Sequence, residues 1–274
     1  MVPSTARYRI QKFRQRERIA SAVLVVLLIS VLGVAIASWQ MYVNQGRAER
    51  RAQTVSSLTD ALLGGITEQL RDVPGTTAMR DELVRSIEKN LRALDGDVAN
   101  SIELTRTVAR THLKLAQTSS ILRGNTERER EAAIRHCTEA IRLLQAAGGS
   151  DGPPPIQELL AEAFAERATW ARYDEEPKWR ERELHVRQKL AASRYNWQNR
   201  QAVTTTMYKL ASAEFQVGRI DEYIKLTEQV LALRKTLVRE RPADDEARRH
   251  VAEAERTLAI YSALLEKQED SVQH

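Results

Sequence analysis

A run of twenty residues without a charged side chain constrains this chain more than any other feature. It extends from Ile19 to Ser38 and reads IASAVLVVLLISVLGVAIAS. An α-helix of this length crosses the roughly 30 Å of hydrocarbon in a bilayer. Residues 1–18 hold six basic side chains against one acid, and short basic flanks of a membrane helix tend to stay in the cytoplasm. We therefore expect residues 1–18 to form a basic cytoplasmic juxtamembrane tail, residues 19–42 to be a single transmembrane helix, and the long C-terminal part to lie outside the cytoplasm.

The residues that flank this run suit the interface between bilayer and water. Basic side chains precede it and amphipathic rings follow it: Arg14, Arg16, Arg18, Trp39 and Tyr42. A cleavable signal peptide is the rival interpretation, supported by the small-residue triplet Ala35-Ile36-Ala37. The apolar core of a signal peptide is usually about 7 to 15 residues long, so the longer run favours an anchor. Gly33 and Ala37 form a small-xxx-small pair, which suggests a homodimer through the membrane helices.

The positive charge of the chain belongs to its N-terminal tail. The whole sequence has a formal net charge of +5, whereas residues 47–274 hold 36 basic and 36 acidic side chains. A neutral domain of evenly mixed charge argues against a nucleic-acid partner, and the arginines of the tail are explained by topology and by attraction to anionic membrane lipid. Cys137 is the only cysteine, so no intramolecular disulfide forms and packing must stabilise the domain.

The part of the chain after the membrane run is expected to be all-α. Ala, Leu, Glu, Arg and Gln dominate it, and β-branched runs with period-two alternation are scarce. Residues 43–97 predict a helical hairpin, because two apolar stripes at helical spacing flank the turn Pro74-Gly75. The second stripe consists of Met79, Leu83, Ile87, Leu91 and Leu94.

Residues 98–267 predict a degenerate tetratricopeptide-like α-solenoid, in which pairs of helices stack in series. The clearest unit is Met207–Val238, with the small Ala211 where two helices approach closely and Gly218 at a turn that needs a positive φ. An earlier unit has the same spacing of small, bulky and small residues on its second helix. The residues assigned to repeat packing are Ala116, Ala133, Cys137, Ala140, Leu210, Ala211 and Gly218.

Turn and capping signals predict the segments between these units. Thr126-Glu127-Arg128-Glu129 has the pattern of a capping box that starts a helix. An inserted loop is expected around Ser119–Asn125, and Gly148–Pro155 is a linker whose prolines exclude helix until about Ile156. The predicted elements after this linker are a third, degraded unit (Ile156–Ala192), a final helix that caps the stack (Asp245–Lys267) and a disordered tail (268–274).

Motifs for catalysis, for metal binding or for a cofactor are missing from the sequence. Its five histidines form no HExxH pattern and no Cys/His ligand cluster, so packing or solvated histidines are expected. Cys137 falls where a repeat places a buried residue, which favours a packed thiol over a nucleophile. Charged runs such as Glu127–Glu131 and Arg180–Glu183 are interpreted as solvated helix faces. We expect a chain that is not an enzyme and holds no cofactor or metal.

The groove of a tetratricopeptide stack is lined by the first helix of each unit and commonly accepts a peptide or a partner helix. The candidate groove residues are Lys114, Arg167, Tyr208 and Lys209. A protein or peptide ligand is therefore the expected partner.

A resemblance to a known family covers nearly the whole chain. The segment Val55–Leu94, with Asp72-Val73-Pro74-Gly75-Thr76 at its turn, resembles the segment that follows the transmembrane helix in bacterial receptor-like serine/threonine protein kinases. The tail from Ala6 to Phe13 is similar to the linker that joins such a kinase domain to its membrane helix. This resemblance implies extracytoplasmic tetratricopeptide repeats on a bacterial inner membrane and a kinase partner. Gly64-Gly65 departs from the family pattern, which has a large residue followed by an acid.

The sequence holds no kinase domain, since a glycine-rich loop and the His-Arg-Asp and Asp-Phe-Gly motifs do not occur in it. Two alternatives remain: the chain is a receptor half that works beside a separate kinase, or its true start lies upstream of Met1. The expected function is that of a membrane-anchored, extracytoplasmic protein- or peptide-binding module, the sensory part of a kinase-type signalling system. An envelope-assembly scaffold or chaperone-like adaptor is one alternative, and a fragment of a full-length receptor kinase is another.

Overall fold

The computed structural model describes residues 82, 84–89, 91–92, 101–122 and 126–272. Several predictions fall on other residues and lie outside this described part. They are the cytoplasmic tail (1–18), the membrane span with its interface and dimer residues (19–42), and the first helix and turn of the hairpin within 43–97. Among the described helices, none is both long enough and apolar enough to cross a bilayer.

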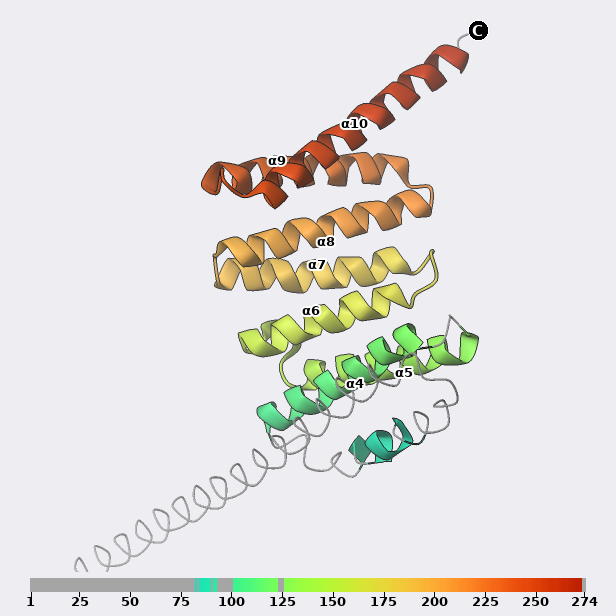
Figure 1. The fold of residues 1–274 in the computed structure, drawn as a ribbon, viewed down its shortest axis with the longest axis vertical. Helices are drawn as coiled ribbons and strands as arrows, with labels where there is room; N and C mark the ends of the chain where they lie inside the picture. Colours follow the sequence, from blue (N-terminus) through green and yellow to red (C-terminus); the bar gives the residue numbers. More distant parts are fainter. Residues whose placement is uncertain (1–81, 83, 90, 93–100, 123–125, 273–274) are drawn as a thin grey trace, which may run out of the picture. The chain divides into compact units, whose positions relative to one another are not determined.

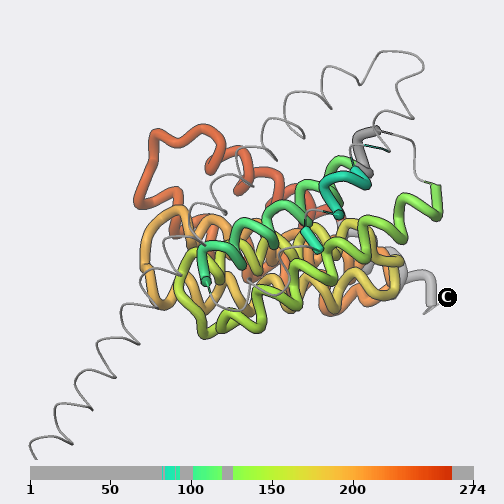
Figure 2. Tube along the Cα trace, turned by 90° about the horizontal axis from the view of Figure 1, so that it is seen from below, coloured from blue at the N-terminus to red at the C-terminus, as the bar shows by residue number. Residues whose placement is uncertain are grey.

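The regular secondary structure of the described residues is helical, so the chain is all-α, as its composition predicts. The helices pack in three pairs: α4 (Ile102–Leu122) with α5 (Glu127–Ala146), α6 (Pro154–Thr169) with α7 (Glu176–Ser193), and α8 (Trp197–Gln216) with α9 (Ile220–Glu240). Each pair contacts the next, and α10 (Asp245–Val272) packs on α9. The pairs therefore form a stack in chain order (Figure 1), and their helices overlie one another when seen at right angles to that view (Figure 2).

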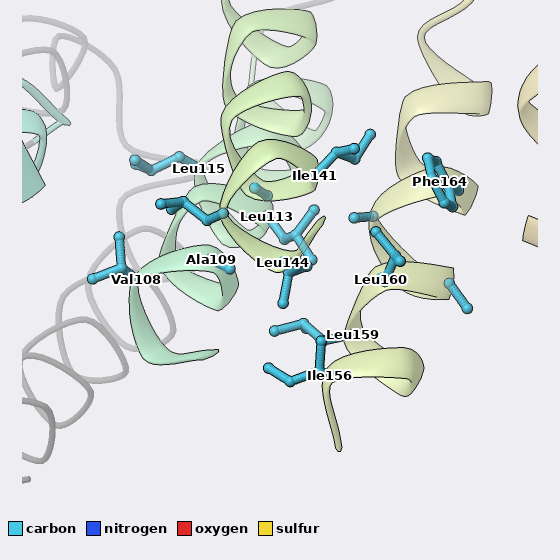
Figure 3. Packing of buried hydrophobic residues seen from close by; sticks show 14 of the residues in the cluster. Val108, Ala109, Leu113, Leu115, Ile141, Leu144, Ile156, Leu159, Leu160 and Phe164 are labelled. Carbon is cyan, nitrogen blue, oxygen red and sulfur yellow. The ribbon is translucent and has the colours of Figure 1, made fainter. Parts of the chain in front are cut away.

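The apolar core is densest at the N-terminal end of the described stack. Residues 84–89 and 91–92 are helical, and Ile87 and Leu91 are buried there, as the spacing of their stripe predicts. They join one cluster with apolar side chains of α4, α5, α6 and α7. Leu144 of α5 and Ile156 and Leu159 of α6 meet between the two helices (Figure 3). Burial of such side chains is worth about 1.5–3 kcal/mol each, so this region anchors the stack.

Local capping explains where two of the helices begin. The Thr126 hydroxyl accepts a hydrogen bond from the Glu129 backbone N–H, and the Thr126 N–H donates to the Glu129 carboxylate at 3.2 Å. This is the predicted capping box, and it starts α5. Asn196 caps α8 in the same sense, since its side-chain oxygen accepts from the Asn199 N–H at 2.8 Å. Each cap satisfies a backbone donor that the first turn leaves free.

The prediction that prolines exclude helix until about Ile156 is wrong. The linker Gly148–Pro155 contains a short 3₁₀ helix, η2 (Gly149–Asp151), and α6 already begins at Pro154. A proline is tolerated in the first turn of a helix, where its missing N–H would have no intrahelical partner. The linker is therefore shorter than the proline content suggests.

Two other predicted boundaries are also corrected. α4 continues through Leu122, which shortens the loop expected around Ser119–Asn125. The Thr118 hydroxyl donates back to the Lys114 carbonyl at 2.7 Å, so this polar side chain is satisfied inside the helix. α10 continues through Val272, and residues 268–272 of the predicted disordered tail are helical.

Small residues allow the paired helices to approach each other. Ala116, Ala133, Cys137, Ala140 and Ala211 are fully buried, and Leu210 is 5% exposed. Ala116 of α4 packs with Ala133 and Cys137 of α5 in a second cluster, which Trp170 closes. A larger side chain at these alanines would overpack the interface, which typically costs about 1–3 kcal/mol.

Replacing Gly218 by alanine is expected to destabilise the chain by about 1 kcal/mol. Gly218 has φ +80° in the turn between α8 and α9, and a Cβ at this position would meet nothing within 4 Å. The cost is therefore conformational and does not arise from a clash. Denaturant unfolding followed by helical circular dichroism measures it. Gly218→Asn should cost less, since asparagine tolerates this backbone region better; an equal loss for both variants would contradict this reason.

Candidate functional site

Two histidines from different helices meet at the N-terminal end of the described stack. His112 lies on α4 and His136 on α5, and their Nδ1 atoms are 3.1 Å apart. The Nε2 atom of His136 is 3.3 Å from the Glu88 carboxylate. If His136 Nε2–H donates to Glu88, then His136 Nδ1 is left to accept from His112 Nδ1–H. Two neutral imidazoles therefore connect α4 to Glu88.

A cavity of about 540 Å³ opens beside this histidine pair. Its lining consists of Glu88, Leu91, Arg92, His112, Ile134, Arg135, His136, Thr138 and Glu139. Both signs of charge occur around it. Among the described residues, no group of three or more His, Cys, Asp or Glu side chains is arranged to hold a metal ion.

The environment of the pair favours uncharged imidazole. Burial, with the neighbouring His136 second, lowers the pKa of His112 to about 4. Burial also lowers the pKa of His136, against the opposing attraction of Glu88. A hydrogen bond from Arg142 lowers the pKa of Glu139, which faces His112. The arrangement keeps two proton-accepting rings neutral between fixed charges, a property that sequence reasoning missed because the two histidines are far apart in the chain.

A buried ion network lies on α7, where the sequence predicts a solvated charged face. Arg180 and Glu183 are 7% and 1% exposed, so the interpretation of Arg180–Glu183 as a solvated face is wrong for these two residues. Arg180 donates to Glu183 at 3.1 Å, and Glu183 also accepts from Arg187 and from the Thr206 hydroxyl of α8, each at 2.9 Å. The network joins α7 to α8 through the Thr206 hydroxyl. Its members recur at helical spacing along one face of α7, but that spacing alone does not reveal burial.

The structure does not present the predicted groove residues as one open site. Arg167 is buried at the end of α6, where its guanidinium carbon lies 4.7 Å from the centroid of the Trp179 ring. Its nearest carboxylate partner is Glu175 at 3.9 Å, and its Nε and Nη1 atoms have no partner among the described residues. Arg167 is therefore a packing residue, because its long stem and planar head fit beneath the tryptophan.

The other groove candidates differ from one another in exposure. The ring of Tyr208 lies 4.9 Å from the guanidinium carbon of Arg234, whose Nη1 donates to the His250 carbonyl at 2.9 Å. Tyr208 therefore helps to join α8, α9 and α10. Lys114 is half-buried on α4, and Lys209 is exposed on α8.

The thiol of Cys137 is inert in this setting. It is fully buried against Ala116, Ala133 and Trp170. Burial raises the pKa of Cys137 to about 12, so the thiolate that would act as a nucleophile does not form near neutral pH. The side chain acts as a small apolar residue at the helix interface, as the repeat spacing predicts.

A second cavity, of about 440 Å³, is lined by residues of α6 and α7, with Gln145 of α5 and Ser150 of η2. Leu160, Phe164 and Val186 form its apolar part. The polar part of the lining consists of Gln145, Ser150, Glu181, Arg182 and His185. The three apolar residues are only 2%, 4% and 2% exposed, so little of their surface reaches the cavity. Sequence reasoning placed the candidate groove on other residues, so this α7 cavity was missed.

The comparisons with known proteins assign this chain to no family. No protein-family model matches the chain, and no curated protein matches it. Among solved structures, the crystal structure of a de novo designed helical repeat protein is similar at 15% sequence identity and a TM-score of 0.24, over 82% of this chain and 99% of that one. The packing described above thus defines an all-α protein of stacked helical pairs.

Proposed function

We propose that this chain is a membrane-anchored, extracytoplasmic module that binds a protein or peptide and acts as the sensory part of a serine/threonine kinase-type signalling system in a bacterial inner membrane. The uncharged run Ile19–Ser38 supports the anchor. The resemblance of Val55–Leu94 to the corresponding segment of bacterial receptor-like kinases supports the signalling role. Lys and Arg before the run support the outward placement of the stack.

The α7 cavity is the observation that supports binding most directly. Its lining combines Leu160, Phe164 and Val186 with the exposed side chain of Arg182. A stack of helical pairs presents extended surfaces that are suited to peptides or partner helices. Catalysis is not part of the proposal: Cys137 is buried, and the Thr138 hydroxyl beside the histidine pair donates to the Ile134 carbonyl at 2.7 Å.

The proposed architecture is that of tetratricopeptide-like repeats with α10 as the capping helix. Burial of Ala116, Ala133 and Ala211 between paired helices supports it, as does the positive φ of Gly218. The three pairs begin at residues 102, 154 and 197, intervals longer than the about 34 residues of a standard repeat. The repeats are therefore proposed to be enlarged and irregular.

An alkaline phosphatase fusion tests the anchor and its orientation. Phosphatase joined after Ala263 in α10 is expected to be active in a Gram-negative host, because the enzyme matures only outside the cytoplasm. The matched control joins the enzyme after Arg18, before the uncharged run, and should be inactive. Membrane fractionation of both fusions accompanies the assay. An inactive Ala263 fusion of full length would defeat the outward placement.

A further inference from the structure

Helix α10, the last helix of the described stack, leaves one long face uncovered (Figure 1). Its extensive contacts within the described part are with α9, and Ala247 and Ala254 are buried. A row of exposed, charged side chains lies on the face turned away from these two alanines, at spacings of three, four and three residues. The row, called the α10 face below, consists of Glu246, Arg249, Glu253 and Arg256.

The charges of the α10 face alternate in sign and are not engaged elsewhere. None of its four side chains forms an ion pair with a described residue. Charges beside the row differ in this respect, since Arg248 is paired with Asp245, and Lys235 of α9 lies 2.8 Å from Glu255. An open hollow of about 510 Å³ runs along the row, and the small Ala252 is part of its lining. The face thus has room for another helix beside it.

The order of the charges makes this face complementary to itself. Glu246 and Arg256 are equally far from residue 251, and so are Arg249 and Glu253. When two copies of α10 run antiparallel and cross at residue 251, each glutamate therefore lies opposite an arginine of the other copy. Two-fold symmetry makes these four contacts reciprocal. In a parallel pair each side chain would meet its own copy, so like charges would oppose one another.

We propose that the α10 face is a homodimer interface, at which two copies of this chain pair antiparallel and cross at residue 251. Exposed ion pairs are individually weak, so the pairing is reversible. The proposed membrane anchor strengthens it by raising the effective concentration of one copy near another. The inference goes beyond the proposed function, because it rests on the charges of α10 and not on a ligand.

Cysteine cross-linking of the full chain in phosphatidylcholine liposomes tests the interface and its direction. Ala252→Cys adds one accessible thiol near the crossing point, because Cys137 is fully buried. A short bis-maleimide should join the two copies, whose residues 252 are about 3 Å apart along the helix axis. Ala259→Cys is the matched control, an exposed alanine seven residues further on the same side of α10. Its two copies would be about 24 Å apart along the axis and should not be joined, whereas a parallel pair would join both cysteines equally.

Charge reversals show whether the contact joins two copies. In the Ala252→Cys chain, Glu246→Arg or Arg256→Glu alone should lower the cross-linked fraction about fivefold, since each places like charges opposite one another twice. A mixture of these two variants, one with a larger tag so that mixed pairs are resolved on a gel, should recover it. Ion pairs within one helix cannot be restored by mixing. Glu253 is left intact because it also attracts the buried Arg234 of α9, and helical circular dichroism checks that each variant is folded.

Three results would overturn the antiparallel dimer. They are the absence of cross-linking through Ala252→Cys, equal cross-linking through Ala259→Cys, and a mixture of the charge variants that is joined no better than either variant alone. Cross-linking that both charge reversals leave unchanged would likewise show that the copies meet through another part of the chain. Flotation of the liposomes reports separately on the anchor, so a failure of the proposed membrane placement is distinguished from a failure of the α10 interface.

Discussion

Replacing Glu183 by leucine is expected to lower the free energy of unfolding by about 3 kcal/mol, the lower end of the range for breaking a buried ion pair. The carboxylate accepts from Arg180, Arg187 and Thr206 and is 1% exposed. Leucine would leave the Thr206 hydroxyl and part of the Arg180 charge buried without a partner. Glu176, 3.1 Å from the Arg180 Nε, still compensates some of that charge, which is why the loss should not be larger.

Denaturant unfolding and amide hydrogen exchange of the full chain in nanodiscs measure this effect. Exchange is needed because a stack of helical pairs unfolds in parts, and the loss should be greatest in α7 and α8, which the network joins. Glu181→Leu is the matched control, since Glu181 is an exposed carboxylate on the same helix outside the network. Its effect should stay within about 0.5 kcal/mol. Equal losses for the two variants would show that the buried network contributes no specific stability.

The helical pairs could be predicted because their signals are local. The capping box at Thr126, the small residues at Ala116 and Ala133, and Gly218 at its turn each act through neighbouring backbone or through a fixed helical spacing. Boundaries were less predictable. Proline in the linker predicts a break in the helix, yet Pro154 occupies the first turn of α6, where its missing N–H costs nothing.

The candidate sites depend on contacts between distant segments, which spacing along one helix does not reveal. His112 and His136 meet only when α4 and α5 pair, and Arg182 becomes part of a cavity only when α7 packs beside α5 and α6. Arg167 is the opposite case, a residue predicted to be exposed that a distant contact buries. A long cation on a first helix suggests a groove position, but Trp179 of the next helix covers it.

Lowering the pH from 6.5 towards 4 is expected to destabilise the chain through the histidine pair. The pKa of His112 is 6.5 when it is free and about 4 in the folded chain, because of burial first and of His136 second. Below pH 6.5 the unfolded chain therefore binds a proton that the folded chain does not. The stabilisation is fully present above pH 6.5 and is lost as the pH falls to about 4. The loss amounts to about 3 kcal/mol for His112.

Burial fixes the direction of this effect, and the charges around the pair act in both senses. Arg142 on α5 disfavours protonation of His112, and Arg135 disfavours that of His136. Glu139 and Glu88 act in the opposite sense, but burial outweighs them. The hydrogen bond from Arg142 that lowers the pKa of Glu139 contributes stability that is lost only below its usual pKa of 4.5. Measurements between pH 6.5 and 5 therefore report mainly on the histidines.

Denaturant unfolding at a series of pH values in this window checks the prediction. His112→Gln should reduce the fall in the free energy of unfolding as the pH is lowered from 6.5 to 5. Glutamine does not titrate in this range, and it retains an amide that donates to His136. His185→Gln makes the same substitution at an exposed histidine on α7 and should leave the slope unchanged. Hydrogen exchange should place the acid-induced loosening in α4 and α5, the two helices that the pair joins. A chain as stable at pH 5 as at pH 7, or a slope that His112→Gln leaves intact, would show that neutral imidazole at this position does not stabilise the fold.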